Sequence, residues 1–113
     1  MSDLAAIAKT RKWAHARLVA LQSKVYAAFL DLEEAAFTDG ELSRLQKELI
    51  AIGISVATDC ESCMQWHIEQ AAEAGATQRQ VLEAVEVAME MGGGRATVPA
   101  RFALRVMDDV FGG

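Results

Sequence analysis

Residues that bend or break helices are almost absent from the first third of this chain, and this feature most constrains its fold. Neither glycine nor proline occurs before Gly40, and the whole sequence contains a single proline, Pro99. Over the same stretch, apolar side chains often recur three or four residues apart, which is the spacing of one face of an α-helix. No segment alternates with the period of two that is typical of a β-strand. The sequence therefore predicts helices and no strands.

Three capping boxes mark helix starts further along the chain. In a capping box, a Ser or Thr pairs with a Glu or Gln three residues later, so that each side chain binds a backbone N–H that the helix leaves unpaired. The candidate pairs are Ser43–Gln46, Thr58–Glu61 and Thr77–Gln80. They predict helices that run roughly over residues 43–57, 59–74 and 78–91.

Glycines and the proline mark the helix ends. Gly75 stands where a left-handed residue would end the helix predicted over 59–74. The run Gly92-Gly93-Gly94 should break the next helix, and a last helix follows with Pro99 near its first turn, where a missing N–H is tolerated. Residues before Gly40 form either one long helix or two with a break near Gln22 and Ser23. We therefore expect an all-α compact bundle of five to six helices in one domain, residues 1–113.

Charge and hydropathy exclude several classes of protein. The chain carries 11 Lys and Arg against 16 Asp and Glu, and no basic run exceeds Arg11-Lys12, so we expect no nucleic-acid partner. The longest apolar stretch, from Leu49 to Ala57, is about half of the roughly 20 residues needed to span a membrane. The N-terminal residues lack the features of a signal peptide, which favours a cytoplasmic location. Because 52% of the residues are apolar, more than a small domain buries, a homo-oligomer is expected.

Two cysteines and a histidine share one face of the helix predicted to begin after Thr58. Cys60 and Cys63 are one turn apart, within plausible reach of a disulfide, and His67 lies four residues beyond Cys63, where an imidazole can accept a thiol proton. With Thr58 as N-cap, Cys60 would be the second helical residue, and the helix dipole would favour its thiolate. In a reducing compartment, such a pair is a poor candidate for a structural disulfide.

Glu48 is the second unusual residue. It directly precedes a segment, residues 49–54, that is apolar nearly all round and therefore expected to be buried. A carboxylate at the edge of such a segment is unfavourable unless it is paired or protonated, which suits it to proton transfer. A short turn at Ala57 and Thr58 would bring this helix against the one that carries the cysteines.

The stretch from Glu48 to Ala71, ELIAIGISVATDCESCMQWHIEQA, resembles the carboxymuconolactone decarboxylase superfamily, in its alkylhydroperoxidase D-like branch. That branch is marked by a Glu, eleven residues, and then Cys-x-x-Cys-x-x-x-His. This is the spacing of Glu48, Cys60, Cys63 and His67. The similarity extends over roughly residues 25 to 111, including the glycines after residue 91.

The resemblance implies an all-α fold that assembles as homo-oligomers, trimers or hexamers, and a peroxidase cycle with no metal, haem or other cofactor. Cys63 would attack the peroxide as a thiolate while Glu48 and His67 manage its proton. Cys60 would then capture the sulfenic acid on Cys63 as a disulfide. An external dithiol or thioredoxin-like reductant would reduce that disulfide.

Two residues complicate this assignment. The helix dipole favours Cys60 as the more acidic thiol, whereas the resemblance and the nearby imidazole favour Cys63. We assign peroxide attack to Cys63, because a base within hydrogen-bond reach acts more directly than a dipole. The well-known hydroperoxidases carry a histidine just before the second cysteine, where this chain has Ser62, so a relay through that position and full peroxidase activity are both in question.

Four alternatives remain open from the sequence. The cysteines could be small buried hydrophobic residues. They could hold zinc together with His67 and Glu48, although structural zinc usually takes a second ligand pair farther along the chain, and none exists here. The protein could be a decarboxylase or lactone enzyme like the superfamily's namesake, which typically lacks the cysteine pair. It could also be a helical assembly module whose cysteines switch with redox state but do not turn over.

Overall fold

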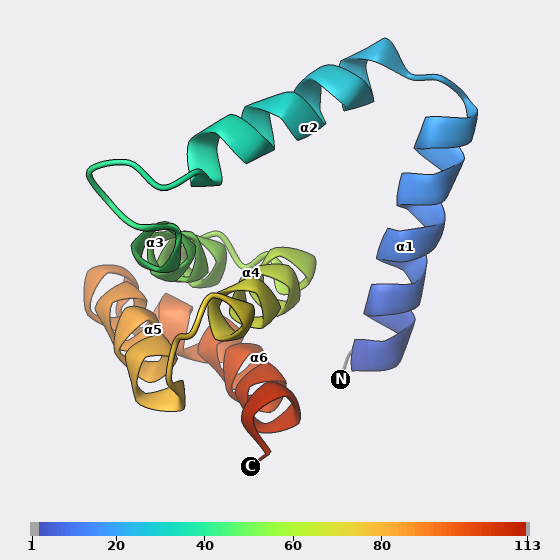
Figure 1. The fold of residues 1–113 in the computed structure, drawn as a ribbon. Coiled ribbons are helices and arrows are strands. Elements are labelled where there is room, and N and C mark those ends of the chain that lie inside the picture. Colours follow the sequence, from blue (N-terminus) through green and yellow to red (C-terminus); the bar gives the residue numbers. More distant parts are fainter. Residues whose placement is uncertain (1–2, 113) are drawn as a thin grey trace. The chain divides into compact units, whose positions relative to one another are not determined.

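The computed structural model describes residues 3–112, which form six α-helices and no β-strand (Figure 1). The helices are α1 (Leu4–Ala20), α2 (Lys24–Phe37), α3 (Arg44–Ala57), α4 (Glu61–Glu73), α5 (Gln78–Gly92) and α6 (Gly94–Phe111). The all-α fold class is therefore confirmed, with the larger of the two predicted helix numbers. No helix in the described part of the chain is both long and apolar enough to cross a membrane.

Contacts within the chain divide it into two units, Met1–Asp39 and Gly40–Gly113. In the first, the chain does break at Gln22, which has a positive φ of 55°, and Ser23 caps the second helix by accepting the backbone N–H of Tyr26. None of the described residues of this unit is buried. The single domain predicted over residues 1–113 stays a prediction.

The second unit holds the core. In it, α3 packs against α4 and α5, and α6 packs against α4, α5 and α3. The largest fully buried side chains come from all four helices: Ile52, Val56, Met64, Ile68, Val81, Val85 and Val106. Burying a side chain of this size contributes about 1.5–3 kcal/mol. This packing fixes α3 against α4, the two helices that carry Glu48 and the cysteines.

Local sequence signals set most helix ends. Ser43 and Thr77 form complete capping boxes with Gln46 and Gln80, as predicted, and α3 and α5 begin directly after them. Gly75 has the predicted left-handed backbone, with φ of 100°. The backbone N–H of the next residue, Ala76, closes the end of α4 by binding the carbonyl of Ala71.

The predicted capping box Thr58–Glu61 is wrong, because Thr58 ends α3 and does not begin α4. Its hydroxyl donates to the carbonyl of Ile54, and Asp59 adopts a left-handed backbone with φ of 53°. The backbone N–H of Cys60 then binds the carbonyl of Ser55, which completes a Schellman motif. Cys60 is therefore the N-cap of α4, and Glu61 is its first residue.

The place of Pro99 also differs from the prediction. The connection between α5 and α6 is the single residue Gly93, which has a positive φ of 62°. Because α6 begins directly after it, Pro99 lies beyond the first helical turn. A proline there cannot donate to the carbonyl of Arg95. Its ring is buried, and this burial against the core offsets the lost hydrogen bond.

Candidate functional site

A carboxylate and an imidazole meet where α3 packs against α4. Glu48 lies on the inward face of α3, one turn before the fully buried Ile52, and only 3% of it is exposed. His67 lies on the face of α4 that turns toward α3. Its Nδ1 is 2.8 Å from Oε1 of Glu48, a hydrogen bond between residues 19 positions apart in the sequence. The contact between the two helices expected from the sequence is therefore present.

The chemistry of this pair follows from which atoms can donate. An ionised carboxylate can only accept, so the hydrogen bond requires that His67 carry its proton on Nδ1. In that tautomer the other ring nitrogen, Nε2, is the basic one. The hydrogen bond to a carboxylate therefore orients the ring and leaves Nε2 as the nitrogen that could accept a proton.

The two cysteines form a disulfide at the start of α4. Cys60 and Cys63 are bonded to each other, with Cα atoms 5.2 Å apart, and both residues are half-buried. As N-cap, Cys60 also accepts a hydrogen bond through Sγ from the backbone N–H of Cys63, at 3.2 Å. His67 follows Cys63 by four residues, so the two side chains lie on the same face of α4.

The N-terminal position of Cys60 matters for the reduced pair. Backbone N–H groups at the start of a helix, together with the helix dipole, stabilise an anion there. The sequence placed Cys60 inside the helix, whereas the structure places it at the cap, where Sγ accepts one of these N–H groups directly. A thiolate on Cys60 would be stabilised at this position.

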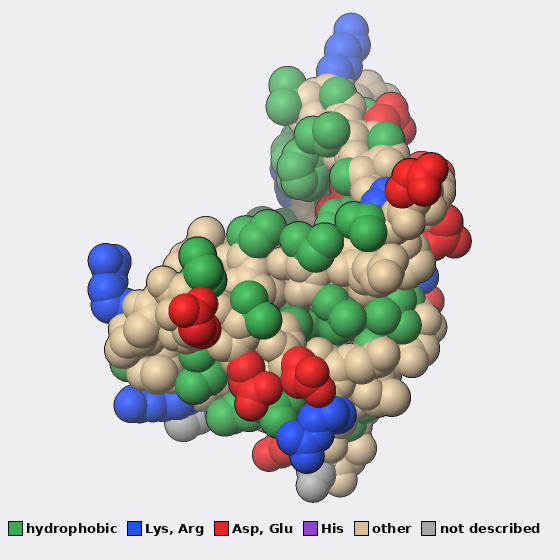
Figure 2. Space-filling view, turned by 90° about the vertical axis from the view of Figure 1, so that its left-hand side faces the viewer, with side chains coloured by type: hydrophobic (Ala, Val, Ile, Leu, Met, Phe, Trp, Pro, Cys, Tyr) green, Lys and Arg blue, Asp and Glu red, His purple; other side chains and the backbone are tan. Residues whose placement is uncertain are grey.

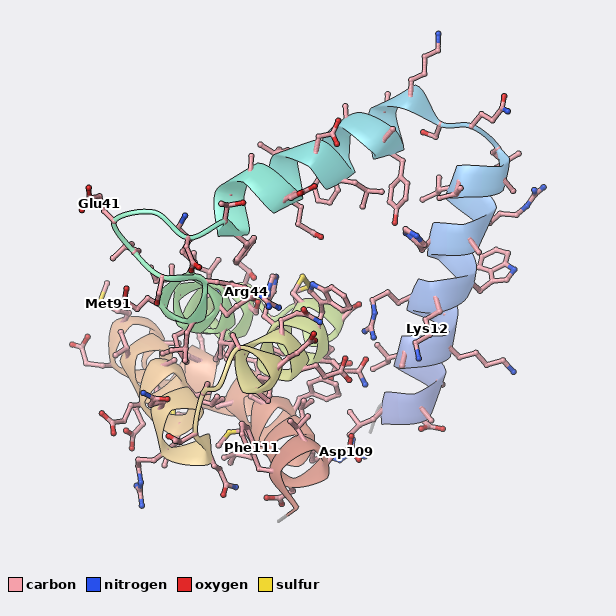
Figure 3. All side chains as sticks on the ribbon, viewed as in Figure 1. Lys12, Glu41, Arg44, Met91, Asp109 and Phe111 are labelled. Carbon is pink, nitrogen blue, oxygen red and sulfur yellow. A yellow bond between two sulfur atoms is a disulfide. The ribbon has the colours of Figure 1, made fainter. Side chains whose placement is uncertain are left out.

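Two further residues join the site, and the sequence reasoning missed both. Arg44, one turn before Glu48 on α3, has its Nε 3.8 Å from Oε2 of Glu48. Its Nη2 donates to Oε1 of Gln70 on α4, at 2.7 Å. Figure 3 labels Arg44 near the start of α3, on the side of α4. The spacing of an arginine four residues before a buried glutamate was the available signal.

The structure thus brings together the four residues predicted for the site as two bonded pairs, Glu48 with His67 and Cys60 with Cys63. Their catalytic roles stay predictions. Among residues 3–112, no three His, Cys, Asp or Glu side chains are grouped so that they could hold a metal ion.

A separate apolar groove runs between α3 and α5. It has a volume of about 670 Å³, and four large side chains along it are at least half exposed: Ile50, Ile54, Val87 and Met91. Figure 2 looks onto this side of the second unit and shows hydrophobic side chains with acidic ones among them. An exposed apolar surface of this kind often marks a binding or assembly interface.

The comparisons with known proteins agree on one family. The family model described as "Carboxymuconolactone decarboxylase family" matches residues 23–108. Uncharacterized protein 4 in the cox locus of Paracoccus denitrificans is 41% identical over 85 residues, which is 75% of this chain and 77% of that protein. Uncharacterized protein H16_B0147 of Cupriavidus necator is 37% identical over 87 residues, 77% of each chain.

Two solved structures share the fold. The carboxymuconolactone decarboxylase family protein lpg0406 of Legionella pneumophila, in its apo form, has a TM-score of 0.90 and 30% identity, covering 95% of this chain and 96% of its own. The protein TM1620 of Thermotoga maritima has a TM-score of 0.83 and 22% identity, covering 94% and 90%. The latter is described as a member of the same family with a suggested involvement in the antioxidative response.

Proposed function

This chain belongs to the carboxymuconolactone decarboxylase family, and we propose that within it the protein is a thiol-dependent peroxidase. One observation carries the proposal: a dithiol pair one helical turn from a histidine that is oriented by a buried carboxylate. The suggested antioxidative involvement of the Thermotoga protein agrees with it, although at 22% identity that likeness concerns the fold alone.

The proposed reaction begins with the reduced protein. His67 takes the proton of Cys63, and the resulting thiolate attacks the terminal oxygen of a hydroperoxide, ROOH. The O–O bond breaks, ROH leaves after taking a proton, and Cys63 becomes a sulfenic acid. Cys60 then attacks the sulfur of Cys63, water leaves, and the disulfide forms. Two electrons have passed from the thiols to the peroxide.

An external dithiol completes the cycle. A small dithiol or a thioredoxin-like protein attacks the disulfide, passes through a mixed disulfide and leaves oxidised, returning both cysteines to thiols. The N-cap position of Cys60 supports this step, because a stabilised thiolate is a better leaving group. Such donors are maintained in the cytoplasm, which is the compartment this chemistry fits.

We also propose that the protein works as a homo-oligomer, a trimer or hexamer, in which a second copy covers the groove between α3 and α5. Ile54 and Val87 are 58% and 64% exposed there, more than a stable monomer usually leaves in one place. The high apolar fraction of the chain, 52%, agrees with a second copy as the occupant.

A coupled peroxidase assay tests the function. Hydrogen peroxide and an organic hydroperoxide are offered with dithiothreitol, and wild type is compared with Cys63→Ser and Cys60→Ser. We expect turnover by wild type, none by Cys63→Ser, and one oxygen atom retained on Cys63 of Cys60→Ser in mass spectra. A wild-type protein that forms its disulfide reversibly without consuming peroxide would be a redox switch, and the peroxidase proposal would be wrong.

A further inference from the structure

Helix α1 carries an exposed row of basic and aromatic side chains. Lys9, Trp13 and Arg17 follow one another at intervals of four residues, so they lie along one face of the helix. All three are exposed, and Trp13 is 65% exposed. α1 holds four basic residues and no acidic one. Because a tryptophan gains more from burial than most other side chains, this face is suited to docking on an apolar surface with an acidic edge.

The groove between α3 and α5 has the complementary pattern. Along α5, Glu83 is followed by Val87 after four residues and by Glu90 after three more, which places an apolar side chain between two acids on one side of the helix. All three are exposed, Val87 to 64%, and the first two line the groove. Ile54 and Met91 add apolar surface to the groove, at 58% and 78% exposed. The groove therefore offers an apolar surface with an acidic edge.

We propose that α1 of a second copy lies in this groove, with its Trp13 against Val87. The two basic residues on either side of Trp13 then pair with the two glutamates on either side of Val87. Opposite charges at the rim of an interface fix the orientation of the docked helix, and the buried aromatic residue supplies most of the affinity. This inference rests on the homo-oligomer proposed above and names the segment of the second copy that covers its groove.

The spacings of the charges agree with this arrangement. An α-helix rises about 1.5 Å per residue, so Lys9 and Arg17 are about 12 Å apart along α1, and Glu83 and Glu90 are about 10.5 Å apart along α5. Lysine and arginine side chains are long enough to take up the difference. Both patterns are nearly symmetric about their apolar residue, so the match holds for either direction of the docked helix.

The occupant is a second copy because one chain holds both surfaces and leaves both exposed, Trp13 to 65% and Val87 to 64%. None of the described residues of the unit Met1–Asp39 is buried, so this unit lacks a core of its own. Two different, complementary surfaces on one chain join identical copies head to tail, and such contacts can close into rings. A trimer is one such ring.

Tryptophan fluorescence follows the docking of α1. The chain has two tryptophans, so Trp66→Phe leaves Trp13 as the one indole. We expect the emission of Trp13 to shift to shorter wavelength as the protein concentration rises from nanomolar to micromolar, together with a rise in the sedimentation coefficient. Trp13→Ala should weaken the association at least about tenfold.

Charge reversal tests the ion pairs. Lys9→Glu with Arg17→Glu, and Glu83→Lys with Glu90→Lys, should each weaken the association about tenfold, because like charges then face each other across the interface. The protein with all four substitutions should recover most of the association, since the pairs are restored with exchanged signs.

The matched control reverses the same number of charges on another helix. Arg95→Glu with Arg101→Glu replaces two exposed arginines of α6 and should assemble as wild type does. Equal weakening in this control would make the effect one of net charge and overturn the pairing. All of the reversed side chains are exposed, so the variants should fold, which circular dichroism checks.

Cross-linking of mixed isotopes distinguishes a second copy from the chain's own helix. ¹⁴N- and ¹⁵N-labelled proteins are mixed at a concentration where the assembly dissociates, concentrated, and treated with a carbodiimide, which joins amines directly to carboxylates. We expect peptides that join Lys9 to Glu83 or Glu90, and these should carry mixed labels as often as equal ones.

Cross-linked peptides with equal labels only would place α1 on its own chain and overturn the proposal. Unchanged association in Trp13→Ala also overturns it. So does a monomeric wild type whose Trp13 emission shifts only with vesicles of phosphatidylglycerol, because α1 would then bind an anionic membrane surface. An assembly that Val87→Glu breaks but Trp13→Ala leaves intact keeps the proposed homo-oligomer and rejects α1 as the segment in its groove. These measurements use no peroxide, so their failure is distinguishable from failure of the peroxidase assay.

Discussion

Nδ1 of His67 and Oε1 of Glu48 lie 2.8 Å apart, and this hydrogen bond joins α4 to α3 one helical turn beyond the Cys60–Cys63 disulfide. The bond fixes which side of the imidazole faces the carboxylate. Glu48 is buried and fixed on one side of the imidazole, and Cys63 lies one helical turn from the histidine on α4. A disulfide without such a pair could still form and break, but it would lack a positioned base for its thiol.

Replacing the carboxylate of Glu48 tests its part in proton transfer. Glu48→Gln keeps the size of the side chain but removes the charge that holds the proton on Nδ1 of His67. We expect kcat for hydroperoxide reduction to fall about 100-fold, the lower end of the usual contribution of acid–base groups. Glu73→Gln, an exposed glutamate at the end of α4, is the control and should keep wild-type activity in the same coupled assay. Full activity in Glu48→Gln would remove this residue from the proposed mechanism.

The N-cap role of Cys60 predicts different effects for two substitutions. A serine hydroxyl can accept the Cys63 N–H in place of Sγ, whereas alanine leaves that N–H unpaired. Urea unfolding of the reduced proteins should show Cys60→Ala less stable than Cys60→Ser by about 1 kcal/mol. Equal stabilities would show that Sγ contributes nothing as a cap.

The turn between α3 and α4 contains a non-glycine residue with a left-handed backbone. Asp59 has φ of 53°, and Asp59→Gly should raise the free energy of unfolding by up to about 1 kcal/mol, because glycine adopts this conformation without steric conflict. Gly75→Ala is the reciprocal test, since Gly75 has φ of 100° and alanine should lower stability there by about 1 kcal/mol or more. Gly75 lies in the next turn, between α4 and α5. Thermal or urea unfolding measures both changes, and the opposite sign at either site would contradict this account of the left-handed residue there.

Charges placed in the apolar groove should disrupt the proposed assembly. Val87→Glu and Met91→Glu put a carboxylate on side chains that are 64% and 78% exposed, so the isolated chain tolerates them but a buried interface does not. Sedimentation velocity should show the wild type as an oligomer and these variants as smaller species. Val98→Glu, on the exposed face of α6, is the control for added charge. A monomeric wild type at micromolar concentration would exclude the assembly, and unchanged oligomers in both variants would exclude the groove.

Much of the fold was predictable because its signals are local. Ser43 with Gln46 and Thr77 with Gln80 each act within one helical turn, and both start a helix where expected. The failure at Thr58 is also local in origin. The same few residues can form either a capping box or a Schellman motif. Asp59 adopts the left-handed backbone conformation that the Schellman motif requires, so the Schellman motif forms.

The site was predictable in part. The sequence pattern indicated that Glu48 is buried, and the family resemblance grouped it with Cys60, Cys63 and His67. Arg44 had only its spacing of four residues from Glu48 as a signal, and Gln70, which lies 26 positions from Arg44, had none. Which residues of α3 and α4 contact each other depends on how the two helices are rotated against one another.

The sequence by itself determined that this chain is helical, where most of its helices begin, and that a thiol pair lies one turn from a histidine, because these features depend on residues within about four positions of each other. Only the tertiary structure decided that Glu48 is hydrogen-bonded to His67 and that Arg44 reaches both Glu48 and Gln70. Those contacts are set when side chains such as Ile52 and Ile68 are buried together, which fixes the two helices side by side.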